Sequence, residues 1–137
     1  MRLLQKTVLA LIGLAIVFLG LDIALGGIPT LGWQIDPGYV APTLPEVFAI
    51  QDSHTRFIGA IWLGIGLIFL LGAWRTELLR QTMISMCMII AIAGLFRLSG
   101  PVAVVLSGNV IGSFLFEIIG FPLVALWLFK SANPKST

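Results

Sequence analysis

Charged residues are scarce in this chain: of its 137 residues, 10% are charged and 58% are hydrophobic. Soluble domains average about 25% charged and about 45–50% apolar residues, so an ordinary soluble domain is excluded. The high apolar fraction excludes a disordered chain, and the single cysteine excludes a disulfide-stapled scaffold. A membrane protein with several spans is the class that remains.

Four apolar runs are each close to the about 20 residues that a helix needs to cross the hydrocarbon core. They cover residues 7–26, 57–74, 82–98 and 110–129. Asp22 interrupts the first run where a cleavable signal peptide would continue its apolar core, so we predict a retained span. No linker divides the chain. We therefore predict an all-α integral membrane four-helix bundle that forms one domain over residues 1–137.

The connections between the runs differ in composition. Residues 75–81 predict a short polar hairpin, and the Ser-Gly-Pro sequence at 99–101 is expected to end the third helix. Residues 43–46 have the spacing of a capping box, which predicts a short interfacial helix over 44–51 in the first outer loop. Asp52 or the serine after it is then expected to cap the start of the second span.

Basic residues concentrate on one side of the four-span arrangement. That side carries Arg2, Lys6, Arg75, Arg80, Lys130 and Lys135. Because cytoplasmic segments retain an excess of Lys and Arg, we predict a multi-pass protein of the bacterial inner membrane with both termini in the cytoplasm. The net charge of +2 then reflects topology, so nucleic acid is not an expected partner.

Four charges lie inside or at the edges of the apolar spans: Asp22, Arg56, Arg97 and Glu117. Each costs about 2.5–3.5 kcal/mol on insertion scales and therefore needs a partner or a function. A rise of about 1.5 Å per residue along each helix puts all four in the outer half of the bilayer, where two acids and two bases neutralise one another. Together with His54, they form the candidate binding or structural cluster. Pro122 predicts a kink in the fourth helix just past Glu117.

Several functions of this cluster remain open. We favour a binding or accessory module that recognises a lipid, a quinone or a partner helix, although a purely structural salt-bridge network explains the same residues. The alternatives are a membrane enzyme acting on a lipid-like substrate, with His54 transferring protons, and a small oligomeric transporter. The expected partners are membrane lipids, further copies of the chain or a larger membrane complex. One histidine and one cysteine at different depths argue against a metal site, and no motif predicts a cofactor.

Residues 52–66, DSHTRFIGAIWLGIG, resemble the signature of a family of small bacterial four-span membrane proteins of unknown function. Members of that family look similar to this sequence over nearly its whole length. The family has an acid late in the first span, an arginine near the end of the third and a glutamate in the fourth, here Asp22, Arg97 and Glu117. The general layout also looks like the DoxX-like group of four-helix proteins. The resemblance implies the fold and the same charged residues, and it implies no activity.

Overall fold

The structure is a computed structural model that describes residues 2–30, 44–108 and 110–131. All regular structure in these ranges is helical, which confirms the predicted all-α class. The elements are α1 (Arg2–Gly26), α2 (Pro45–Trp74), α3 (Thr76–Phe96), η2 (Arg97–Ser99), α4 (Val102–Val105), α5 (Ile111–Leu115), η3 (Phe116–Gly120) and α6 (Phe121–Lys130). Thr43 of the predicted capping box and Lys135 lie outside the described residues.

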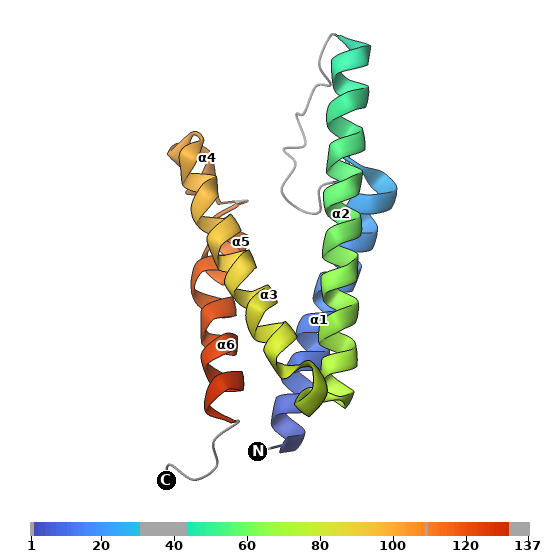
Figure 1. The fold of residues 1–137 in the computed structure, drawn as a ribbon. Helices are drawn as coiled ribbons and strands as arrows, with labels where there is room; N and C mark the ends of the chain where they lie inside the picture. Colours follow the sequence, from blue (N-terminus) through green and yellow to red (C-terminus); the bar gives the residue numbers. More distant parts are fainter. Residues whose placement is uncertain (1, 31–43, 109, 132–137) are drawn as a thin grey trace. The chain divides into compact units, whose positions relative to one another are not determined.

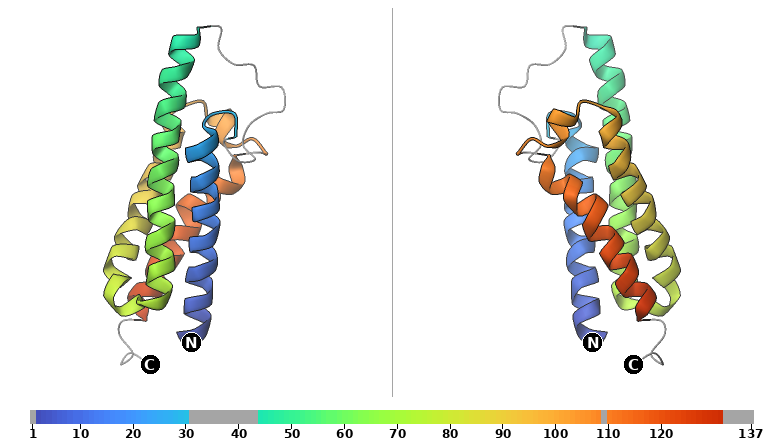
Figure 2. Two further views of the ribbon diagram at one scale, coloured as in Figure 1. Left: turned by 90° about the vertical axis from the view of Figure 1, so that its right-hand side faces the viewer. Right: turned by 90° about the vertical axis from the view of Figure 1, so that its left-hand side faces the viewer.

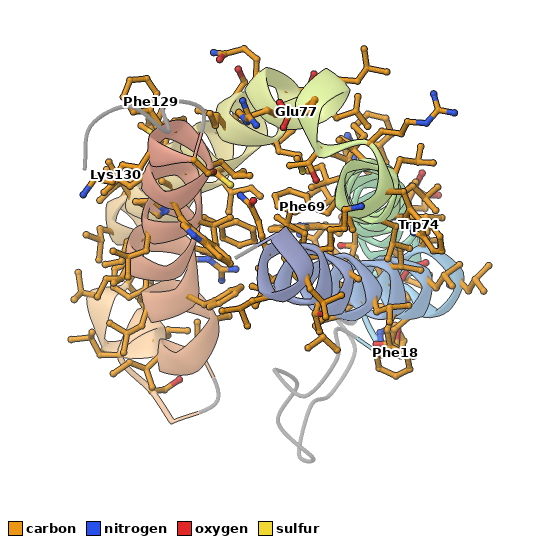
Figure 3. The ribbon with its side chains drawn as sticks, turned by 90° about the horizontal axis from the view of Figure 1, so that it is seen from below. Phe18, Phe69, Trp74, Glu77, Phe129 and Lys130 are labelled. Carbon is orange, nitrogen blue, oxygen red and sulfur yellow. The ribbon has the colours of Figure 1, made fainter. Side chains whose placement is uncertain are left out.

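Four helical segments are long and apolar enough to cross a membrane, and each overlaps one predicted span. They are Leu3–Gly26, Pro45–Trp74, Thr76–Ser99 and Ile111–Lys130. Large apolar side chains point outward from these segments, as those of Phe18, Trp74 and Phe129 do in Figure 3, where lipid tails would contact them. The protein is therefore a multi-pass helical membrane protein. Its chain forms two compact units, residues 1–74 and 75–137, and each is described by itself.

The first unit is an antiparallel pair of helices, α1 and α2, which lie side by side in Figures 1 and 2. Glycines let the two backbones approach closely. A Cβ added at Gly66 would lie only 2.6 Å from the backbone nitrogen of Val17, and one added at Gly20 would lie 2.7 Å from the Cα of Leu63. The hydrophobic effect does not drive helices together in lipid. Small residues at the interface instead allow close van der Waals packing of the two helices.

Helix α2 corrects two of the predictions. The interfacial helix predicted over 44–51 is not a separate element, because residues 45–74 form one continuous helix. Asp52 and Ser53 consequently lie inside α2 and cap no helix start. The reason is local: no proline or glycine occurs between Pro45 and Gly59 to end the helix. At a rise of about 1.5 Å per residue, α2 is about 45 Å long and exceeds a hydrocarbon core of about 30 Å.

The second unit begins with α3, and here the predicted hairpin over 75–81 is wrong. Only Arg75 separates α2 from α3, since the residues from Thr76 onward are helical. Glu77 lies in the first turn, where a negative charge stabilises a helix, and its carboxylate accepts a 2.7 Å hydrogen bond from Arg80. The predicted stop at 99–101 is confirmed, because α3 continues only through the 3₁₀ turn η2 to Ser99.

The last helical segment runs through α5, η3 and α6 and packs along α3 (Figure 1). A kink was predicted just past Glu117, and the structure has a π-helical turn, η3, around Glu117 itself, in which the N–H of Phe121 donates to the carbonyl of Phe116. Pro122 follows at once and has no N–H to continue the ordinary α-helical pattern. π-turns of this kind are rare and occur frequently at functional sites. This one contains Glu117.

Candidate functional site

Arg97 and Glu117 form a bidentate ion pair within the second unit. Arg97 Nε donates to Glu117 Oε2 over 2.7 Å, and Arg97 Nη2 donates to Glu117 Oε1 over 2.7 Å. Glu117 is only 6% exposed, whereas the Arg97 side chain keeps 34% of its surface exposed. Both carboxylate oxygens are thus satisfied by one guanidinium in the parallel geometry that makes such pairs strong.

The local structure on both sides of this pair follows from the sequence. Arg97 begins the 3₁₀ turn that ends the third span, and Glu117 lies in the π-turn of the fourth. Gly94, one turn before Arg97, opens the space between them, since a Cβ there would lie 2.9 Å from Glu117 Cβ and 3.2 Å from Glu117 Oε2. Gly94 therefore lets α3 and η3 approach closely enough for the Glu117 carboxylate to reach the Arg97 guanidinium.

The pair leaves part of the arginine available for a ligand. A guanidinium carries five N–H donors, and only two of those on Arg97 donate to Glu117. The two donors on Nη1 and the second on Nη2 have no hydrogen-bond partner among residues 75–108 and 110–131, the described part of the second unit. In a membrane, N–H groups without an acceptor are costly. The free edge of Arg97 is therefore the part of the second unit best suited to bind an oxygen acceptor.

Arg56, predicted as a binding or structural residue of the charged cluster, caps the end of α1. Its Nη1 donates to the carbonyl of Leu25, and its Nη2 donates to the carbonyl of Gly26 over 3.2 Å. These carbonyls belong to the last turn of α1, which has no further helical N–H to satisfy them. A cation at a helix C-terminus also interacts favourably with the helix dipole. Arg56 is thus a structural residue of the first unit.

Asp52 completes this cap, whereas the sequence interpretation had expected it to cap the start of the second span. Its Oδ2 accepts a 2.7 Å hydrogen bond from Arg56 Nε, and its Oδ1 accepts a 2.8 Å bond from the N–H of Ile28. The chain turns between α1 and Ile28 at Gly27, whose φ of +71° favours glycine. The i,i+4 spacing of Asp52 and Arg56 on one helix was the available signal.

The remaining two candidates, His54 and Asp22, lie in the first unit. His54 is exposed, and its Nδ1 lies 2.9 Å from the carbonyl oxygen of Ile50 on its own helix. This geometry gives no support for the predicted proton transfer by His54. Asp22 is half-buried near the end of α1, where its backbone carbonyl accepts a 2.9 Å bond from Thr30 Oγ1. The described residues include no group of three or more His, Cys, Asp or Glu side chains that could hold a metal ion.

The fold and this site define a small multi-pass helical membrane protein with a buried carboxylate–guanidinium pair. The chain belongs to the family described as a domain of unknown function, DUF4345, whose family model matches residues 4–128. This confirms the resemblance to an uncharacterised family, and the matched range includes all four charges predicted inside or at the edges of the spans. It provides no link to the DoxX-like group. Comparisons with curated proteins and with solved structures found no match.

Proposed function

We propose that this protein is a binding or accessory module of the bacterial inner membrane that recognises a lipid-like molecule through the guanidinium of Arg97. The proposed topology, with both termini in the cytoplasm, is supported by Arg75 and Arg80 between the second and third spans and by Lys130 after the fourth. In this topology, Arg97 lies at the far end of α3 from Arg75 and faces the outer leaflet.

One observation supports the binding role: an intramembrane arginine is held by a buried carboxylate and still has free donors. Charged residues inside a membrane are expensive, and they mark functional sites more often than chance. Glu117 fixes the position of the guanidinium, so a ligand would not have to order a flexible side chain on binding. Each hydrogen bond from a charged donor to an acceptor contributes about 1.5–3 kcal/mol.

Native mass spectrometry of the gently extracted protein tests this proposal. The informative variant is R97Q/E117Q, because it removes both members of the pair and leaves no stranded charge. The matched control is R80Q/E77Q, which removes the other Arg–Glu pair of the second unit, also joined by a 2.7 Å bond. We expect a lipid-like adduct on the wild-type protein and on the control variant, and its loss from R97Q/E117Q.

Two results would contradict the proposal. The first is an adduct that persists unchanged in R97Q/E117Q, which would place binding elsewhere. The second is a wild-type protein that carries no small molecule and whose added mass is another polypeptide. That result would indicate a partner helix as the occupant of the site.

A further inference from the structure

We infer that the ligand of Arg97 presents a neutral oxygen acceptor, a carbonyl or hydroxyl group of a lipid-like molecule, and is not an anionic head group. This inference rests on the proposed function and names the chemical class of its ligand. It follows from the charges that surround the free edge of Arg97 in the second unit.

The site has no net charge of its own. Arg97 is neutralised by Glu117, whose two oxygens lie 2.7 Å from guanidinium nitrogens. The other basic residues described in the second unit are Arg75, Arg80 and Lys130. Lys130 is the last residue of α6, at the end that lies farther from Glu117. Arg75 precedes the first residue of α3, whereas Arg97 follows its last residue, and α3 spans about 30 Å at about 1.5 Å per residue. That separation exceeds the screening length of about 8 Å in physiological salt, so these cations do not reinforce the site.

An anionic head group would gain little from such a site. A phosphate at the free edge of Arg97 would be attracted by the guanidinium and repelled by the carboxylate of Glu117 behind it. It would also give up hydration, and this cost is far larger for an ion than for a neutral polar group. A carbonyl or hydroxyl oxygen accepts the same N–H donors at a much smaller desolvation cost. Neutral acceptors are therefore favoured.

Short-chain probes separate these ligand classes in a native mass spectrometry titration of the detergent-solubilised wild-type protein. Dioctanoylglycerol and a short-chain quinone are neutral, and they distinguish a glycerolipid from a quinone as the source of the oxygen. Dioctanoyl phosphatidylglycerol has the same acyl chains as the first probe and adds a negative charge. We expect at least one neutral probe to bind roughly ten-fold more tightly than phosphatidylglycerol.

Substitution E117Q is expected to shift the preference in the opposite direction, toward the anionic probe. It keeps a polar side chain beside Arg97 and leaves the arginine charge uncompensated, so the site gains one positive charge. Removing a repulsive charge at about 6 Å, with an effective dielectric constant of about 20, changes affinity for an anion by about a hundred-fold. Because Arg97 is one-third exposed, we expect roughly a ten-fold gain for phosphatidylglycerol after solvent screening. The control E77Q, on an exposed glutamate of the same unit, should leave the preference unchanged.

The outcomes separate this inference from the proposed function. Wild-type protein that binds phosphatidylglycerol as tightly as the neutral probes, with binding lost in R97Q/E117Q, overturns the inference and supports the proposed function. Binding of all probes that is insensitive to R97Q/E117Q, or no binding at all, overturns both. If E117Q does not fold, the wild-type titration alone decides between neutral and anionic ligands.

Discussion

Substitution R97M is expected to destabilise the protein strongly. In the structure, Glu117 is 6% exposed and both of its carboxylate oxygens accept 2.7 Å hydrogen bonds from Arg97. Methionine matches the length of the arginine stem and donates no hydrogen bond, so it leaves a buried carboxylate without its cation. Breaking a buried pair from one side costs about 3–5 kcal/mol, and the partial exposure of Arg97 favours the lower end of that range.

The double variant R97M/E117Q tests the reason for this loss. It removes both charges, and an uncharged amide is much cheaper to bury than a stranded carboxylate. We therefore expect the double variant to be more stable than R97M alone by about 2 kcal/mol, because it no longer buries an unpaired carboxylate. A merely steric effect of methionine at position 97 would be retained in the double variant.

Unfolding by SDS titration in mixed detergent micelles measures both free energies, with helix content by circular dichroism as the signal. The control is E77Q, because Glu77 is 77% exposed and an exposed pair contributes little. The reasoning is refuted if R97M unfolds at the same SDS fraction as the wild-type protein. It is also refuted if R97M/E117Q is no more stable than R97M.

Two further predictions concern the first unit. G66A should destabilise it by about 1–3 kcal/mol through overpacking, since the new Cβ would lie 2.6 Å from the backbone nitrogen of Val17. By contrast, G64A should be tolerated because nothing lies within 4 Å of its added Cβ, and equal SDS-unfolding midpoints for the two variants would contradict this account. D52A should accelerate hydrogen–deuterium exchange at the amide of Ile28, which donates to Asp52 Oδ1 over 2.8 Å. Unchanged exchange there would argue against the cap.

The sequence was sufficient to predict the four spans, because apolar runs of about 20 residues have few structural alternatives. It was less informative at helix boundaries. Asp52 and Ser53 are typical N-cap residues, yet α2 passes through them without interruption. Residues 76–81 carry the polar Thr76, Glu77, Arg80 and Gln81 and are nevertheless helical, and Glu77 and Arg80 form an i,i+3 pair on the helix surface. Polarity marks the end of a membrane span, whereas the end of a helix requires a residue that breaks it.

The sequence named Arg97 and Glu117 among five candidate residues, and it did not show which of the five pair with each other. The cost of intramembrane charge identified Arg56, Arg97 and Glu117 from the sequence alone. The estimated depth of Arg56 in the bilayer could not show that it donates to the carbonyls of Leu25 and Gly26. Every residue has a backbone carbonyl, so the sequence does not single out these two acceptors. The pairing of Arg97 with Glu117 depends on the close approach at Gly94 and on the π-turn, and both of these are tertiary features.

Solid-state NMR of the protein in lipid nanodiscs tests the central claim, that the free edge of Arg97 binds a neutral oxygen acceptor, most directly. The protein is labelled with ¹⁵N-arginine, and R97K identifies the Arg97 side-chain signal among the five arginines. We predict that ¹³C-carbonyl dioctanoylglycerol or a ¹³C-carbonyl quinone dephases the Arg97 Nη signal, and that the ³¹P of phosphatidylglycerol does not. Dephasing by ³¹P alone, or by none of these nuclei, would contradict the account.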